Sequence, residues 1–243
     1  MSKILCFVFA VAILGAAVRA EFVPYTSGSP TQILQGNGKG KGIPNAPKMQ
    51  AVASGAASAS TRVNPYESLV ARLAQKVGGL SGAQTEAANA IIAELHSHLT
   101  NKDLPTNFNL AAYLLATAYA DHSLLPSEEQ LKTDDVKASA MQAPYFKQGT
   151  QGRGYVHFSG AYNYNRFARD VRVAIDLNPK LLLDKKVAAK VLVFGVLNGR
   201  FTGVKIDKFI PAAGTPDFAG ARRAVNGDVN AVSIAKLAAS LTN

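Results

Sequence analysis

Cysteine is nearly absent from the 243-residue sequence, which contains only Cys6. If the N-terminal segment that carries Cys6 is removed, a disulfide framework, a cysteine-based zinc site and a thiol nucleophile are all excluded. After the first twenty residues, no apolar run is long enough to span a bilayer. Hydrophobic residues nevertheless make up 48% of the chain, which is too many for a chain that is disordered throughout. We therefore expect a folded domain with a buried core.

Acidic residues are also scarce, at 16 against 26 Lys and Arg, so the formal net charge is +10. Such an excess suggests a polyanionic partner, such as nucleic acid, an anionic cell envelope or an acidic glycan. The distribution of this positive charge along the chain helps to choose among these partners. Residues 1–20 carry +2, residues 21–63 carry +3 and residues 64–243 carry only +5. Half of the excess thus lies outside the expected domain. We therefore predict contact with an anionic cell envelope and no nucleic-acid partner.

Residues 1–20 have the pattern of a secretory signal peptide. Lys3 supplies the basic start, Ile4–Val18 is almost entirely apolar, and Val18-Arg19-Ala20 resembles a small-residue cleavage site. The alternative is an uncleaved N-terminal anchor, although the apolar run is short for a membrane span. We expect a secreted protein, extracellular or periplasmic, with no transmembrane span once the signal peptide is cleaved.

Residues 21–63 are basic and rich in Gly, Pro, Ala and Ser. They offer few bulky apolar side chains to offset the entropy lost on ordering, so we predict a flexible linker. The linker could hold the protein near an anionic surface or act as a passive spacer.

Residues 64–243 are expected to form one mainly α-helical domain with a very small β element. Apolar positions at helical spacing, capping residues and Gly or Pro stops predict seven helices. These cover residues 64–77, 81–98, 108–121, 162–173, 184–198, 217–225 and 230–241. Tyr155–Ser159 is the best strand candidate. The sequence shows no internal repeat, no strand–helix alternation and no phosphate-binding glycine loop.

Asp121 is the carboxylate that most suggests chemistry. It follows Leu110 by eleven residues, which at 100° per residue brings it to within about 20° of the same helix face. A carboxyl group on an apolar face at a helix C-terminus is difficult to ionise, because burial and the helix dipole both oppose its charge. A general acid needs a carboxyl group of this kind, which keeps its proton near neutral pH. The alternative is a frayed last turn in which Asp121 points into water.

Two further acids, Glu128 and Glu129, follow in residues 122–150, a stretch expected to be a long loop. A second carboxylate near Asp121 would suit acid–base hydrolysis of a glycoside, in which inverting enzymes leave room for a water between base and sugar. The alternative is a pair of solvated acids that begin a short helix, with Pro126 in its first turn.

Residues 151–164 combine small residues with polar and aromatic side chains suited to a hydroxyl-rich ligand. The side chains concerned are those of Arg153, His157, Ser159, Asn163 and Tyr164. The alternative is a tight turn that leads into a helix. Elsewhere, His96 and His98 are two residues apart and would face different sides of a helix, so no metal site and no cofactor are predicted.

The same stretch resembles a known family. Residues 152–164 are similar to the Gly-Arg-Gly-aliphatic-aliphatic-Gln-Leu-Ser/Thr…Asn-Tyr segment of family 19 glycoside hydrolases, the chitinases and the related phage and bacterial lysozyme-like enzymes. Residues 111–119 resemble the helix that delivers that family's His-Glu, residues 175–179 its Asp-Leu…Asn-Pro turn, and residues 221–227 its Arg-Arg-x-Ile-Asn-Gly helix end. The matches occur in the same order across residues 110–241. The resemblance implies an α+β lysozyme-like fold with two helical lobes and a cleft.

The resemblance also assigns roles to individual residues. Asp121 takes the place of the general-acid glutamate, with Ala120 in place of the preceding histidine. Glu128 or Glu129 takes the place of the carboxylate that activates the attacking water. His157 replaces a glutamine that contacts substrate. The polar cleft residues that this sequence retains are Arg153, Ser159, Asn163 and Asn226.

By this resemblance, the expected function is hydrolysis of β-1,4-linked N-acetylhexosamine polymers, chitin or peptidoglycan, in cell-wall degradation, with inversion and without a cofactor. An acid one methylene shorter can misplace its proton by about 1 Å, which can cost on the order of a hundredfold in rate. The alternative is therefore a catalytically impaired glycan-binding or cell-surface protein on the same fold. A third possibility, a nucleic-acid or envelope binder driven by charge alone, needs an aromatic and basic surface that the sequence does not clearly show.

Overall fold

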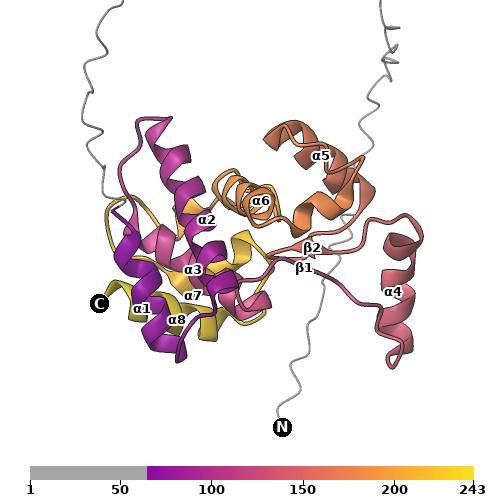
Figure 1. The fold of residues 1–243 in the computed structure, drawn as a ribbon, viewed down its shortest axis with the longest axis horizontal. Coiled ribbons are helices and arrows are strands. Elements are labelled where there is room, and N and C mark those ends of the chain that lie inside the picture. Colours follow the sequence, from indigo (N-terminus) through magenta and orange to yellow (C-terminus); the bar gives the residue numbers. More distant parts are fainter. Residues whose placement is uncertain (1–64) are drawn as a thin grey trace, which may run out of the picture. The chain divides into compact units, whose positions relative to one another are not determined.

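The computed structural model describes residues 65–243, so the predicted signal peptide and linker lie outside the described residues. The described residues belong to one compact unit (Figure 1). Its α-helices are α1 (Glu67–Val77), α2 (Gly82–Thr100), α3 (Phe108–His122), α4 (Val136–Lys147), α5 (Ala161–Val171), α6 (Lys185–Leu197), α7 (Phe218–Ala221) and α8 (Ala231–Thr242). Three short 3₁₀ helices are η1 (Pro179–Leu183), η2 (Ile206–Lys208) and η3 (Arg222–Ala224).

The β structure of this part of the chain is a single antiparallel pair, β1 (Ser127–Glu128) with β2 (Arg153–Gly154). In its register Ser127 lies opposite Gly154 and Glu128 opposite Arg153. Helices account for 60% of the described residues, so the predicted mainly α class with a very small β element is confirmed. Within residues 65–243, no helix combines the length and apolar composition that a membrane span requires.

Helix α3 forms the centre of the core. Every side chain from Leu110 to Ala118 is buried, as expected for a helix that is apolar on all sides. The helix contacts α1, α2 and α8. Asn107 caps its first turn by accepting a hydrogen bond from the Leu110 backbone N–H at 2.9 Å. Asp121 and His122, in the last turn, are therefore held by the most deeply buried helix of the fold.

The end of α3 is sharply defined. Ser123 and Leu124 both adopt left-handed backbone angles, with φ of 51° and 63°, and so the helix cannot continue. Their N–H groups bond to carbonyl oxygens of the last turn, those of Tyr119 and Ala118 respectively. The Leu124 side chain is fully buried in the core. This turn directs the chain from α3 into β1 and so sets the position of the two candidate acids that follow, Glu128 and Glu129.

A second apolar cluster supports residues 151–164. Phe158, Tyr164 and Phe167 pack against one another, and Phe201 joins them, with ring centroids 4.8–6.3 Å apart. α5 contributes two of these rings and contacts α6, which also packs against α2. The polar segment around β2 thus adjoins a buried aromatic cluster, to which it contributes Phe158 and Tyr164.

Two predictions for this region are wrong. The proposed strand Tyr155–Ser159 is a turn followed by a single bridge between Arg153 and Phe158. Left-handed angles at Gly154 and His157, with φ of 87° and 49°, fold the chain back before a strand can extend. The proposed loop of residues 122–150 contains both β1 and α4. α4 buries only one side chain and carries Pro144 in its interior, so it lacks the apolar stripe by which a helix is recognised.

Candidate functional site

Asp121 forms a bidentate ion pair with Arg222. Arg222 donates from its two terminal nitrogens to the two carboxylate oxygens, at 2.8 and 2.9 Å. The side chains are only 7% and 1% exposed. The third donor of Arg222, Nε, bonds to the Val229 carbonyl oxygen at 2.8 Å. Asp121 is therefore neither in water nor on a frayed turn, and its charge is matched by a fixed guanidinium.

The surroundings of this pair are largely dehydrated. Tyr113 and Thr117 precede Asp121 by two turns and one turn on the same face of α3, and both are fully buried. Burial raises the pKa of Tyr113 to about 12, with opposing contributions from Arg222, which lowers it, and Asp121, which raises it. The ion pair thus lies within electrostatic range of a buried hydroxyl, in a setting where charge–charge attraction is strong.

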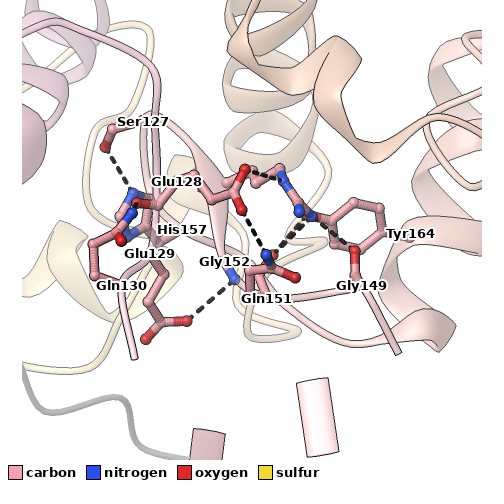
Figure 2. Close-up of polar contacts among 10 residues, drawn as sticks. Ser127, Glu128, Glu129, Gln130, Gly149, Gln151, Gly152, His157 and Tyr164 are labelled. Carbon is pink, nitrogen blue, oxygen red and sulfur yellow. Dashed lines mark hydrogen bonds and ion pairs between the residues drawn. The ribbon is translucent and has the colours of Figure 1, made fainter. Parts of the chain in front are cut away.

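Glu128, on β1, is paired with the buried Arg153 on β2 (Figure 2). One carboxylate oxygen accepts from Arg153 Nε at 3.0 Å and the other from Gln151 Nε2. Burial alone would raise the pKa of Glu128, but the hydrogen bond and charge of Arg153 outweigh it, so the pKa lies below its ordinary value. Glu128 is therefore an ionised structural partner of Arg153.

Arg153 ties this hairpin to α5. It is 4% exposed and donates to the Gly149 carbonyl at 2.9 Å and to the Tyr164 hydroxyl at 3.1 Å. Tyr164 in turn donates to the Gln151 carbonyl at 2.8 Å. Both of these predicted ligand-binding residues are thus buried within the protein, where they organise the segment from residue 149 to residue 164.

Glu129 is held by neutral donors. One carboxylate oxygen accepts from Gln142 Nε2 at 2.7 Å and the other from the Gly152 backbone N–H at 3.1 Å, and the Glu129 N–H donates to the Gly152 carbonyl at 2.8 Å. Among the described residues no arginine or lysine forms an ion pair with it. Of the three candidate carboxylates, Glu129 alone keeps its charge unmatched by a bonded cation.

Two histidines stack between these acids. The rings of His122 and His157 lie 3.6 Å apart between centroids and 25° from parallel. His157 Nε2 is 2.8 Å from Ser127 Oγ in a hydrogen bond (Figure 2). Burial, followed by the neighbouring His122, lowers the pKa of His157 to about 3, and burial also lowers the pKa of His122. Both rings are therefore neutral at pH 7.

The stack connects the predicted acids electrostatically. His122 interacts with Asp121, Arg222 and Glu129, and His157 interacts with Glu128. Each of the three predicted carboxylates thus lies within electrostatic range of one ring of the His122–His157 pair. His122 is the residue that the sequence reasoning missed. Its signal in the sequence is its position directly after Asp121, whereas the resemblance to family 19 expects a histidine directly before the acid, where this chain has Ala120.

The hydrogen bonds of the remaining predicted ligand residues, Ser159, Asn163 and Asn226, are local. Asn163, in the first turn of α5, donates to the Ser159 carbonyl at 2.7 Å, and both residues are partly exposed. Gly160, with a φ of 95°, turns the chain between them. Asn226 comes one turn after Arg222, and its N–H bonds to the Arg222 carbonyl at 2.9 Å. Ser159 and Asn163 thus form a local unit, while Asn226 belongs to the Arg222 segment.

Other features of the described surface do not coincide with this centre. A hollow of about 630 Å³ lies between α2 and the start of α6, and one of about 380 Å³ lies at the start of α8. Neither is lined by a predicted site residue. In residues 65–243, no group of three or more His, Cys, Asp or Glu side chains is arranged to hold a metal ion.

Comparison with known proteins gives no assignment. No protein-family profile matches the chain, and no significant similarity to a curated protein or a solved structure is found.

Proposed function

We propose that this is a secreted protein that binds β-1,4-linked N-acetylhexosamine polymers, chitin or peptidoglycan, with little or no turnover. The polymer class comes from the resemblance of residues 110–241 to family 19 glycoside hydrolases. The observation that carries the low turnover is the bidentate pair between Asp121 and Arg222.

Glycoside hydrolysis requires a carboxylic acid that carries a proton at working pH. Asp121 stands in the general-acid position, but both of its carboxylate oxygens accept hydrogen bonds from the buried Arg222 guanidinium, so neither oxygen is free to donate a proton to a ligand. The hydrogen bond and charge of Arg153 hold the pKa of Glu128 below its ordinary value, so Glu128 is ionised. A Michaelis complex at this site would therefore lack the proton that the leaving oxygen must receive.

Several of the predicted ligand residues carry groups suited to holding a sugar. His157 is neutral at pH 7 and offers a ring nitrogen, Glu129 offers a carboxylate, and Ser159 and Asn163 offer partly exposed hydrogen-bonding groups. Hydroxyl and N-acetyl groups of a glycan are matched by donors and acceptors of these kinds. The positive charge of the chain would also favour contact with an anionic cell wall.

Hydrolysis is the second candidate, and the surroundings of Glu129 favour it. A carboxylate held by neutral donors is able to activate a water, and His122 places Glu129 and Asp121 in one electrostatic neighbourhood. In this mechanism Asp121 separates from Arg222 and protonates the leaving oxygen, while Glu129, or Glu128, removes a proton from the water that attacks the opposite face of the sugar.

The two candidates are separated by incubating the purified chain with chitin oligomers and with murein. Binding is measured by calorimetry or co-sedimentation, and new reducing ends are measured by mass spectrometry. The proposal expects binding without new ends. Products that disappear on Asp121→Asn would establish hydrolysis instead, and absence of binding to both polymers would contradict both functions.

A variant pair on α5 tests where the glycan binds. Asn163→Ala removes the side chain that bonds to Ser159 and is expected to weaken glycan binding. Asn165→Ala is the matched control, because Asn165 is exposed and bonds only locally to the Ala161 carbonyl. Equal affinities for the two variants would place the glycan elsewhere.

A further inference from the structure

Helix α4 is attached to the described domain by an unusual contact. Its only buried residue is Gln142, which is 7% exposed, and the remaining side chains of the helix are exposed or partly exposed. A surface helix normally docks through an apolar stripe. Here the buried contact is made by a polar amide, which is stable only when its hydrogen bonds are satisfied.

The Gln142 amide is fully engaged. Nε2 donates to Glu129 at 2.7 Å and approaches the Gln130 carbonyl at 3.4 Å, while Oε1 accepts from the Lys132 backbone N–H at 2.8 Å. These acceptors and donors all belong to the segment that follows β1. Gln142 therefore fixes the path of that segment and the orientation of the Glu129 carboxylate together.

Glu129 is held from a second direction by β2. The Gly152 N–H donates to its other oxygen at 3.1 Å, so the carboxylate is clamped between α4 and the hairpin. Neither donor carries a charge. This distinguishes Glu129 from Glu128, whose charge is matched by Arg153, and from Asp121, whose charge is matched by Arg222. A neutral clamp orients a carboxylate and leaves its charge available.

We propose that Gln142 is the positioning residue of the glycan site, and that it holds Glu129 as the carboxylate that contacts the sugar. The sugar chemistry rests on the proposed function, whereas the positioning of Glu129 does not. The group that Glu129 receives is a hydroxyl or N-acetyl N–H donor of the glycan, because an ionised carboxylate accepts strongly from such donors. A lysine or arginine at position 142 would orient the same carboxylate but neutralise it.

A charge-based variant with a pH readout tests the positioning role. In Gln142→Glu, the introduced carboxylate repels Glu129 at pH 8, and affinity for chitin oligomers is expected to fall at least tenfold relative to the unmodified chain, as for loss of about one hydrogen bond to a charged group. Two carboxylates that share a site take up one proton well above the usual range for Glu. At pH 5 the introduced group can therefore donate as the amide did, and most of the relative affinity is expected to return.

A second glutamine at the end of α4, Gln148, provides the control for this experiment. Gln148→Glu adds an equal charge at the exposed C-terminal end of α4 and is expected to leave affinity unchanged at both pH values. If Gln142→Glu is equally weak at pH 5 and pH 8, Gln142 only anchors α4 and the positioning role is wrong.

A double-variant cycle gives a second, independent measure. Gln142→Leu and Glu129→Gln are each expected to weaken glycan binding about tenfold or more, and the double variant is expected to bind no more weakly than Glu129→Gln alone. If the affinity losses of the two single variants instead multiply in the double variant, the proposal is wrong, because Gln142 would then affect binding independently of Glu129.

The proposed function can fail separately. If the unmodified chain binds neither chitin oligomers nor murein, the glycan assignment is lost, and the positioning of Glu129 is then decided by NMR of the Gln142 side-chain amide. A large shift of the Gln142 side-chain N–H signals in Glu129→Gln would support the hydrogen bond between Gln142 and Glu129. Unchanged signals overturn it.

Discussion

The guanidinium of Arg222 and the carboxylate of Asp121 lie edge to edge, with N–O distances of 2.8 and 2.9 Å, and join the end of α3 to η3 across 101 residues of sequence. Both side chains are almost completely buried. Removing charges of this kind from water is costly, and only a geometry with satisfied hydrogen bonds repays it. The third donor of Arg222, on Val229, completes that requirement. Loss of either partner would therefore leave an uncompensated buried charge at the position where the resemblance places an acid.

Arg222→Met is expected to destabilise the protein by about 3–5 kcal/mol, because it leaves Asp121 buried without a partner. Urea unfolding at pH 7 measures the free energy. Arg223→Met is the matched control: Arg223 is 62% exposed and pairs with the exposed Asp228, so its loss should cost no more than about 0.5 kcal/mol. The double variant Asp121→Leu with Arg222→Met should recover much of the loss. Equal costs for Arg222→Met and Arg223→Met would show that the buried pair contributes no more than a surface pair.

The stacked histidines predict a loss of stability in mild acid. The folded-state pKa of His157, about 3, lies below the ordinary value of 6.5, so below pH 6.5 the unfolded state binds more protons than the folded state. Stability is thus full above pH 6.5 and falls as the pH is lowered towards 3. Between pH 7 and pH 5, we expect the unmodified chain to lose about 1–2 kcal/mol more than His157→Gln does.

NMR titration gives the direct check. The ring signals of His157 should stay in their neutral position at pH 5. A titration midpoint near 6.5 would contradict both the buried environment of the ring and the predicted pH dependence.

The ion pair between Glu128 and Arg153 predicts a second pH effect at lower pH. The pKa of Glu128 is lowered from 4.5, so its contribution to stability is present above pH 4.5 and is lost as the pH falls through the folded-state pKa. In urea unfolding between pH 6 and pH 3, Glu128→Gln is expected to show a shallower loss of stability than the unmodified chain. Glu67→Gln, at an exposed position in α1, controls for removing one carboxyl group. Identical slopes for Glu128→Gln and the unmodified chain would rule out the effect.

Local sequence signals account for most of the helical fold. α6 is predicted because Asp184 caps it and a dense apolar run follows, and the structure shows Asp184 accepting from the Lys186 and Val187 N–H groups. α3 is predicted from its apolar content and ends within one residue of the predicted boundary. α4 is not predicted, because its only fully buried side chain is a polar amide, and hydrogen bonds from that amide to a distant segment leave no periodic pattern in the sequence.

In the candidate site too, local sequence predicts some features, and contacts between distant segments determine the others. Helical spacing predicts that Asp121 lies on the buried face of α3, and its side chain is indeed buried. Periodicity does not predict its partner, because Arg222 reaches Asp121 only when the C-terminal segment has packed onto α3. The stacking of His122 on His157 is equally inaccessible, since it depends on left-handed turns at Ser123 and at His157 itself. The sequence thus indicates which residues gather, and tertiary packing determines which charges are matched.

Gly152 is predicted to be the most sensitive glycine of the site. A Cβ atom there would lie 2.8 Å from both Cβ and the carbonyl oxygen of His157, and 3.1 Å from the Glu129 carboxylate. Gly152→Ala should therefore push apart the two segments that carry His157 and Glu129, at a cost of about 1–3 kcal/mol in unfolding free energy. Glycan affinity should fall with it, because Glu129 loses its fixed orientation. Gly82→Ala, at the start of α2 with no atom within 4 Å of the added Cβ, should instead be neutral or stabilise by up to about 1 kcal/mol. If calorimetry and urea unfolding find Gly152→Ala as stable as Gly82→Ala, the close packing of His157 and Glu129 around Gly152 is wrong.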